Sequence, residues 1–214
     1  MEDQYRVLTS PGEAIFRDRG SKFLGFAIPV RSEEAVMQAL DDIRKLHPKC
    51  NHHCYAYRLG EGQDRYRAND DGEPGGSAGR PILGQIDSRG LSDVLVVVAR
   101  YFGGTKLGVP GLINAYKTAA AEALDTGQSD YRKLVTPVVL TFGYELMSPV
   151  MNALNRLELD MVEQDFGETA TISIALPRSQ TSDLLRRLKA YVAGVYLEEV
   201  DEEFEVEGLD INIG

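Results

Sequence analysis

The chain has 214 residues, of which 43% are hydrophobic and 26% are charged. Such a composition suits a globular protein with one large or two small cores, and we expect two domains. No apolar run approaches the ~20 residues needed to span a bilayer, and the N-terminus MEDQYRVLTS lacks the basic-then-apolar pattern of a secretory signal. The sequence therefore predicts a cytoplasmic protein without a membrane anchor.

The net charge of −10 is unevenly distributed. Residues 1–134 contain 18 Lys/Arg and 18 Asp/Glu, whereas residues 135–214 contain 5 and 15. An acidic second half repels a phosphate backbone, so wrapping of a long DNA duplex is excluded and any nucleic-acid site belongs to a local patch of the first half. A protein partner is the alternative for the acidic half.

The chain begins with strand-like sequence followed by a helix. Residues 5–30 alternate in polarity and carry turn signals at residues 11–12 and 19–20, which predicts a β-hairpin or meander. Ser32 is the expected N-cap of a helix that ends at His47-Pro48. The apolar face of this helix consists of Val36, Ala39, Leu40, Ile43 and Leu46.

Residues 51–59 and 64–68 are predicted to form the next two strands. The motif Cys-Asn-His-His-Cys there invites a zinc site. Along a strand, however, Cys50, His52 and Cys54 would share one face, with the two cysteines ~13 Å apart, too far for shared zinc bonds or a disulfide. His52 is a candidate site residue or catalytic acid/base, and the alternative is a hydrogen-bonded histidine beside the core.

A Gly/Pro-rich segment, residues 70–78, follows and is called the acidic loop. It carries Asp70, Asp71, Glu73 and Ser77, with Arg80 just beyond it. Clustered carboxylates can hold Mg²⁺ together with water. Aspartates in such segments also hydrogen-bond the local turn, so a structural loop that contacts the neighbouring basic loop is the alternative.

Residues 93–100, Asp-Val-Leu-Val-Val-Val-Ala-Arg, predict a strand buried on both faces. A short helix is expected just before it, at residues 81–86. Residues 103–108 follow the strand and are called the basic loop, and Pro110 is suited to the first turn of a further helix. The buried face of that helix is predicted to contain Leu112, Tyr116, Ala120 and Leu124.

The basic loop is a candidate anion site. A strand, a glycine turn and a helix N-terminus together direct backbone N–H groups and the positive end of a helix dipole toward a ligand. Seven residues are predicted to bind an anion or nucleic acid here: Arg80, Arg100, Gly103, Gly104, Thr105, Lys106 and Gly108. The alternative is that the glycines only form a tight turn and that Arg100 is a structural ion-pair partner.

The two loops together carry a family resemblance. The sequence DDGEPGGSAGRP begins at Asp70, and RYFGGTKLG begins at Arg100. Two long motifs in this order and spacing resemble the IMPACT/YigZ family of cytoplasmic proteins linked to translation, over roughly residues 17–124. The chain departs from the family at Val109-Pro110 and at Asn114, where members usually have Thr-Gly and often a basic residue, which puts strong nucleic-acid affinity in doubt.

The resemblance and the pattern together predict an α+β protein of two domains. Residues 1–134 are expected to form an α/β sandwich with helices on one face of a mostly antiparallel or mixed sheet, which the resemblance sharpens to a ribosomal protein S5 domain 2-like fold. Residues 135–214 are expected to form a ferredoxin-like βαββαβ domain with an acidic tail, similar to domain V of elongation factor G. Its predicted elements are a strand at 137–144, a helix capped by Ser148, strands at 160–166 and 169–176, a helix at 181–191 and a strand at 195–200.

These observations predict a binding or regulatory protein linked to translation, which engages RNA, the ribosome or a translation factor through the glycine-rich loops. The alternative is a metal-assisted enzyme that acts on a phosphorylated small molecule or a nucleic-acid end. In that enzyme His52 is the acid/base, the acidic loop holds Mg²⁺, and Arg100 and Lys106 hold phosphate. No other cofactor is expected. A third reading is a partner that binds only protein through the acidic second domain.

Overall fold

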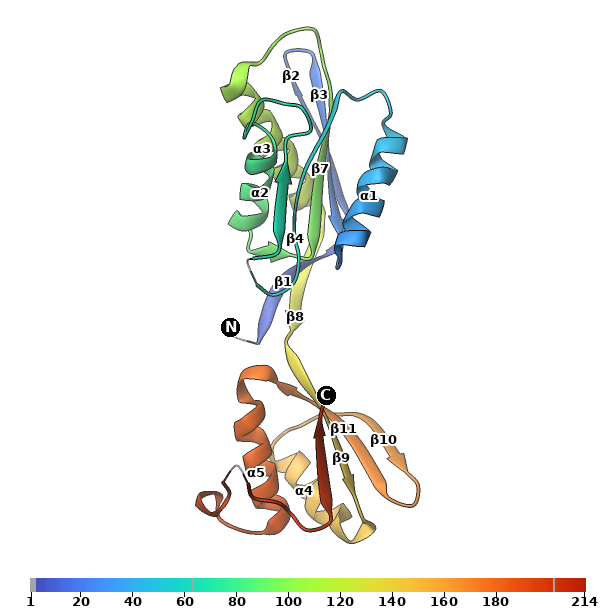
Figure 1. The fold of residues 1–214 in the computed structure, drawn as a ribbon, viewed down its shortest axis with the longest axis vertical. Coiled ribbons are helices and arrows are strands. Elements are labelled where there is room, and N and C mark those ends of the chain that lie inside the picture. The colour runs from blue at the N-terminus through green and yellow to red at the C-terminus, as the bar shows by residue number, and fades with distance from the viewer. Residues whose placement is uncertain (1–2, 63, 202) are drawn as a thin grey trace. The chain divides into compact units, whose positions relative to one another are not determined.

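The computed structural model describes residues 3–62, 64–201 and 203–214. The chain divides into two compact units: the N-terminal unit, Gln4–Arg132, and the C-terminal unit, Lys133–Gly214 together with Asp3. Each unit combines helices with a largely antiparallel sheet, which confirms the predicted α+β class (Figure 1). Within the described residues, no helix is long and apolar enough to cross a membrane.

A five-stranded sheet forms the centre of the N-terminal unit, and all its neighbouring strands are antiparallel. In spatial order its strands are β2 (Gly12–Asp18), β3 (Ser21–Pro29), β7 (Val94–Tyr101), β4 (His52–Arg58) and β5 (Tyr66–Asn69). The middle strand β7 is buried on both faces from Val94 to Arg100, as its unbroken apolar sequence predicts.

Helices cover both faces of this sheet, so the prediction of helices on one face was wrong. Helix α1 (Glu33–Leu46) packs on one side, and α2 (Gly79–Ser88) and α3 (Gly108–Thr126) pack on the other (Figure 1). A strand that is apolar on both faces needs cover on both, and α1 supplies the second layer. Alternate β7 residues such as Val97 and Val96 pack into the two separate cores.

The helix starts and hairpin turns follow local chemistry. The Ser32 side chain accepts a hydrogen bond of 3.2 Å from the backbone N–H of Ala35, which confirms the predicted N-cap of α1. The β2–β3 turn lies at Arg19 and Gly20, both with positive φ, as predicted. Strand β1 (Gln4–Ser10) does not join this hairpin; it belongs to a separate sheet with β6 (Leu91–Ser92) and β8 (Gln128–Lys133).

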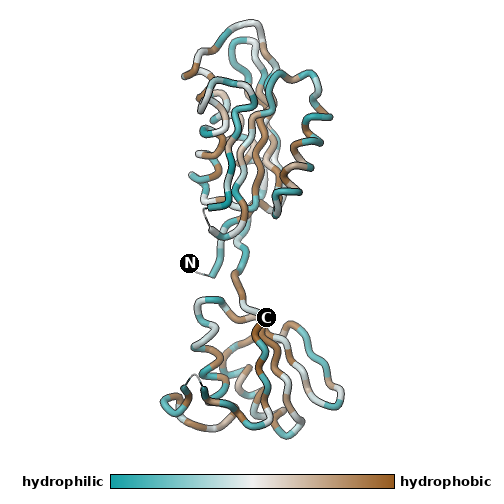
Figure 2. The backbone as a smooth tube through the Cα atoms, viewed as in Figure 1, coloured by the Kyte–Doolittle hydropathy of each residue, from teal (hydrophilic) through white to brown (hydrophobic). Residues whose placement is uncertain are grey.

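The C-terminal unit has the ferredoxin-like arrangement. Its strand order is β10-β11-β9-β12, and helices α4 and α5 pack on one face of the sheet. The bounds are β9 (Val135–Phe142), α4 (Met147–Arg156), β10 (Met161–Phe166), β11 (Ala170–Pro177), α5 (Thr181–Ala193) and β12 (Leu209–Ile213). The backbone of this unit contains several brown, hydrophobic stretches (Figure 2). Apolar residues of β9 and β11, such as Leu140 and Ile172, pack in one core with residues of α4 and α5.

Two local predictions for this unit were wrong. Residues 195–200 contain no strand; they include the 3-10 turn η3 (Leu197–Glu199), and Arg186 donates hydrogen bonds to the carbonyl groups of Leu197 and Val200 at its two ends. The fourth strand is instead β12, which follows the acidic tail, residues 201–207. Glu202 of this tail lies outside the described residues. Ser148 lies inside the first turn of α4 rather than at its N-cap, because the turn η1 (Tyr144–Leu146) leads directly into the helix.

Candidate functional site

The acidic and basic loops meet at one edge of the N-terminal sheet. Strands β5 and β7 are both antiparallel to β4, so they run in the same direction and end at the same edge. The acidic loop leaves β5 and leads into α2, and the basic loop leaves β7 and leads into α3. The N-termini of both helices therefore lie at this edge, which is the arrangement that favours anions.

A buried ion pair joins the acidic loop to β7. The Arg100 guanidinium donates to the Glu73 carboxylate at 2.5 Å, with 7% and 4% of the two side chains exposed. The Tyr116 hydroxyl of α3 donates to the same carboxylate oxygen at 2.7 Å. Burial, together with the neighbouring Cys54 and Glu73, raises the pKa of Tyr116 above its usual range, so this hydroxyl remains a donor.

Arg100 is enclosed by aromatic rings as well. Its guanidinium carbon lies 5.4 Å from the centre of the Phe23 ring and 5.5 Å from that of Phe102. Its Nε atom is buried and has no hydrogen-bond partner among the described residues. These contacts favour the interpretation of Arg100 as a structural ion-pair partner rather than as a residue that binds an external anion. Its charge is already paired with Glu73 and is shielded from solvent.

Asp70 serves the N-terminus of α2. One carboxylate oxygen accepts the N–H groups of Ala78 (2.9 Å) and Gly79 (2.8 Å), and the other accepts the N–H of Gly76 at 2.8 Å. Burial raises the pKa of Asp70, but these three N–H groups and the nearby Arg80 lower it by more, so the net shift is downward from 3.8. The carboxylate thus fills the anion site at the start of α2.

The stabilising effect of Asp70 should depend on pH. A carboxyl group with a lowered folded-state pKa contributes stability that is fully present above its unfolded-state pKa and is lost as pH falls through the folded-state pKa. We therefore expect Asp70→Asn to destabilise the protein at pH 7 and the difference from wild type to shrink below about pH 4. Urea unfolding at pH 7, 5, 4 and 3 measures this, with the exposed Asp41→Asn as control; a difference independent of pH would contradict it.

Asp71 holds the first residues of β4. It adopts a positive φ of 43°, and its carboxylate accepts the backbone N–H of His53 at 2.6 Å and lies 3.7 Å from Arg44. Its carbonyl oxygen lies 2.7 Å from Nδ1 of His52. Since a carbonyl only accepts, Nδ1 carries the hydrogen, and in neutral His52 the Nε2 atom is left as an acceptor. The hydrogen-bonded histidine that the sequence allowed is thus observed, and the ring also packs near Gly72.

The three carboxylates proposed for Mg²⁺ point to different partners. Asp70 faces the start of α2, Asp71 faces β4 and α1, and Glu73 faces β7 and α3. Across the described residues 3–62, 64–201 and 203–214, no three His, Cys, Asp or Glu side chains are placed to share a metal ion. The side chain of Ser77 likewise turns inward and donates to the carbonyl of Pro74 at 2.6 Å. The acidic loop therefore has the contacts of a structural loop, which joins β7 through Arg100 and α3 through Tyr116.

The two cysteines lie apart. Cys50 precedes β4 and packs with the core beneath α1, whereas Cys54 lies within β4 in the core beneath α2 and α3. The expectation that both would share one strand face was therefore wrong. Cys54 is fully buried, its thiol donates to the carbonyl of Asp70 at 2.9 Å, and burial raises its pKa above the usual range. Both cysteines are free thiols.

The glycines of the basic loop have distinct structural tasks. A Cβ at Gly103 would lie 1.9 Å from the carbonyl carbon of Gly20, so this glycine lets the loop touch the β2–β3 turn. Gly104 and Gly108 have φ of 86° and 71°, a region that favours glycine. Among the seven predicted anion-site residues, these three shape the backbone.

Thr105 and Lys106 carry the exposed side chains of the basic loop, whose other residues are glycines and the buried Leu107. Helix α3, which follows, has no side-chain cap among the described residues and no acidic residue in its first turn. Its start at Gly108 is exposed, whereas that of α2 already binds the Asp70 carboxylate. This end of α3 therefore keeps N–H groups that can donate hydrogen bonds to an external anion beside a positive charge.

The structure brings together most residues singled out in the sequence. His52 of β4 is paired with Arg100 of β7 in the sheet register, and Glu73 forms the ion pair with Arg100. Sequence reasoning placed Tyr116 in the core but missed that its hydroxyl binds Glu73. The signal available was a polar hydroxyl in an otherwise apolar helix stripe, because a buried tyrosine hydroxyl usually has a partner.

Comparisons with known proteins show which family has a similar sequence and fold. The family model described as the Impact N-terminal domain matches residues 19–124, which include both loops. IMPACT family member YvyE of Bacillus subtilis is 32% identical over 182 residues, covering 85% of this chain and 84% of that protein. IMPACT family member YigZ of Escherichia coli is 26% identical over 194 residues, with 90% and 95% covered. A crystal structure described as that of a hypothetical protein matches with a TM-score of 0.63 at 25% identity, covering 89% and 94%. The chain therefore belongs to the IMPACT family.

Proposed function

We propose that this protein is a regulator linked to translation that binds phosphate groups of RNA, on the ribosome or near a translation factor, through the exposed start of α3. The link to translation rests on the family to which the chain belongs. The observation that carries the anion site is the exposed N-terminus of α3, which has no side-chain cap among the described residues and follows directly after the exposed Thr105 and Lys106 in the chain.

The neighbouring charges support this assignment. The acids of the same edge are already engaged, since Glu73 neutralises Arg100 and Asp70 is bound to α2. Lys106 and Arg80 are both exposed, so both present positive charge to solvent at this edge, and the Arg80 charge also acts on the Asp70 carboxylate. A phosphate that approaches α3 therefore meets an attractive local field despite the net charge of −10.

Lys106→Ala should weaken binding to ribosomal subunits. Removing one phosphate contact lowers the affinity of a protein for RNA and reduces the slope of log K against log salt by about 1. Co-sedimentation with purified ribosomal subunits across a salt series measures both quantities. The matched control is Lys45→Ala, which removes the same charge from α1, on the opposite face of the sheet.

Two results would contradict this proposal. One is wild-type protein that fails to co-sediment at the lowest salt concentration. The other is Lys106→Ala that binds with the affinity and salt slope of the wild type, or that loses no more binding than Lys45→Ala. Arg100 is unsuitable as a first test, because its removal leaves the buried Glu73 carboxylate without a cation, held only by the Tyr116 hydroxyl among the contacts described above.

A further inference from the structure

One face of the C-terminal sheet is not covered by any helix among the described residues of its own unit. Helices α4 and α5 both pack against the face that carries residues such as Leu140 and Ile172. The opposite side chains of the two middle strands, β9 and β11, are short and only half-buried. These side chains are Val139, Thr141, Thr171 and Ser173.

Strand register places acids at the borders of this face. Directly paired residues of antiparallel strands point to the same side of a sheet. Asp210 of β12 pairs with Thr141, Thr141 pairs with Thr171, and Thr171 pairs with Asp165 of β10. One row across the sheet therefore reads Asp-Thr-Thr-Asp, with a carboxylate at each edge.

The next row has the same design. Asn212 of β12 pairs with Val139, Val139 with Ser173, and Ser173 with Glu163 of β10. All four border residues are exposed. The acids of the four strands, Glu163, Asp165 and Asp210, thus all lie on the uncovered face, around a neutral centre.

Positive charges are absent from these strands. None of the sequences of β9, β10, β11 and β12 contains Lys, Arg or His. The five cations of residues 135–214 all lie in α4, α5 or the turn between β11 and α5: Arg156, Arg178, Arg186, Arg187 and Lys189. Several are held there, for example Lys189 by the carbonyl of Phe204 at 2.6 Å. The acids of the open face therefore have no cation within the sheet to neutralise them.

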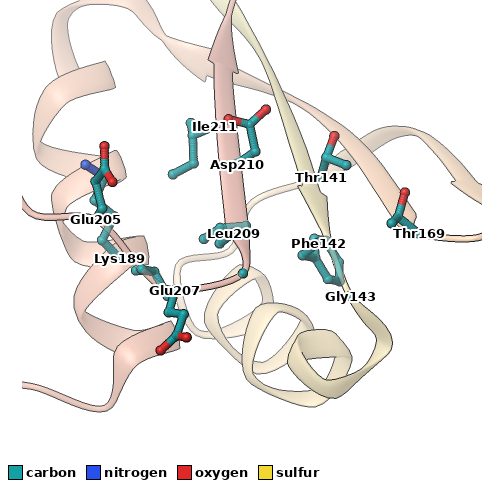
Figure 3. Close-up of a pocket in the computed structure, with 12 residues that line it drawn as sticks. Thr141, Phe142, Gly143, Thr169, Lys189, Glu205, Glu207, Leu209, Asp210 and Ile211 are labelled. Atoms are coloured by element: carbon teal, nitrogen blue, oxygen red, sulfur yellow. The ribbon is translucent and has the colours of Figure 1, made fainter.

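The close-up of β12 shows the two sides of the strand. Ile211 extends toward the side of α5, whereas Asp210 extends to the other side (Figure 3). Asp210 and Thr141 also line a pocket of about 550 Å³ at this end of the unit. Asp210 is thus exposed both to the open face and to a hollow at its border.

We propose that this open sheet face, Glu163, Asp165, Asp210, Asn212 and the four short side chains between them, binds a positively charged amphipathic helix of a partner protein. Three strand spacings of ~4.8 Å put the acidic borders about 14 Å apart. A helix with side chains is about 10–12 Å wide, so it fits along β9 and β11 between the borders. Its small residues would meet the neutral centre, and its Lys or Arg side chains would reach the acids on both sides.

This inference goes beyond the proposed function, because it concerns the other unit and a ligand of opposite charge. RNA is disfavoured at this face, since its phosphates would meet three carboxylates and no cation. A positively charged helix gains attraction at both borders and covers half-buried apolar and hydroxyl groups. Charge complementarity of this kind controls which partners associate.

The probe for the test is a fluorescein-labelled 18-residue helical peptide of alanine and lysine, with lysines flanking an alanine stripe. Fluorescence anisotropy with the full chain should show binding that weakens as salt rises. Combined Glu163→Lys, Asp165→Lys and Asp210→Lys should weaken it about tenfold or more. The isosteric set Glu163→Gln, Asp165→Asn and Asp210→Asn should weaken it less, and circular dichroism checks that each variant folds.

The matched control reverses three other exposed acids of the same unit, Glu198, Glu203 and Glu205, to lysine. They lie between α5 and β12, and the change in net charge is identical. Binding should fall less than about threefold in this control. Three results would overturn the proposal. They are equal losses in the two reversed variants, no binding of the peptide at low salt, and tighter binding of a single-stranded RNA probe to wild type than to the variant with Glu163, Asp165 and Asp210 reversed. Lys106→Ala should leave peptide binding unchanged, which separates this result from the test of the basic loop.

Discussion

Glu73→Ala should lower the free energy of unfolding of the N-terminal unit by about 3–5 kcal/mol. The change leaves the Arg100 guanidinium buried with no carboxylate, and it removes the acceptor of the Tyr116 hydroxyl. An unpaired buried charge costs far more than the pair itself contributes, because desolvation of the ion is no longer offset. Urea unfolding followed by circular dichroism measures the effect.

A double variant separates the pair from its surroundings. Glu73→Ala combined with Arg100→Met removes both charges, so the loss should be much smaller than the sum of the two single losses. The exposed Asp183–Arg187 pair of α5 is a useful control, and Asp183→Ala should change stability little. Additive losses in the double variant, or a loss in Glu73→Ala no larger than in Asp183→Ala, would show that the ion pair is not coupled as described.

Gly103→Ala should destabilise the N-terminal unit by about 3 kcal/mol. The new Cβ would lie 1.9 Å from the Gly20 carbonyl carbon and 2.2 Å from the backbone nitrogen of Ser21, so the basic loop and the β2–β3 turn cannot both stay in place. Backbone atoms cannot rotate away as a flexible side chain would. Thermal unfolding of the purified variant measures the loss.

The control for this glycine is Gly84→Ala in α2. A Cβ there meets no atom within 4 Å, and alanine is a better helix former than glycine by up to about 1 kcal/mol. The same chemical change should therefore stabilise the protein at residue 84 and destabilise it at residue 103. A stable Gly103→Ala protein would mean that the contact between the loop and the turn is loose.

Local signals in the sequence predicted most helices and strands. Ser32 and the periodic apolar residues after it specify α1, because a cap and an amphipathic face act within a few residues. Periodicity alone could not show which sheet face α1 covers, since an apolar stripe packs equally well against either side of a doubly buried strand. That choice depends on the connection from β3 and on the whole N-terminal unit.

The fourth strand of the C-terminal sheet was predicted at the wrong place in the chain. Val195–Val200 has strand-like composition, but Arg186 bonds to its carbonyl groups and fixes a 3-10 turn instead. Strand β12 has only five residues, two of them polar and exposed, and it exists because β9 offers a free edge. Pairing with a strand about 70 residues away is a tertiary effect that local propensity does not contain.

The candidate site was predicted in composition but not in connectivity. Acids and bases in two neighbouring loops predicted contact between the acidic loop and the basic loop; the contact observed is the Glu73–Arg100 pair, which joins the acidic loop to the end of β7 just before the basic loop. Which acid pairs with which base depends on the path of the loop over the sheet edge. From the sequence, Asp70 could equally have been a ligand of a metal ion or a partner of a basic side chain. The structure shows that its carboxylate accepts hydrogen bonds from the N–H groups at the start of α2.

The internal hydrogen bonds of the acidic loop have a thermodynamic consequence for any encounter at this edge. Asp70, Glu73 and Ser77 each fix the loop to α2, β7 or its own backbone, so its conformational entropy is given up when the chain folds. A partner that meets the loop therefore finds it already ordered and loses little further entropy there on association. The acidic loop is therefore preorganised where Glu73 contacts Arg100 of β7 and Tyr116 of α3, and binding at the anion site proposed above would not require the acidic loop to reorder.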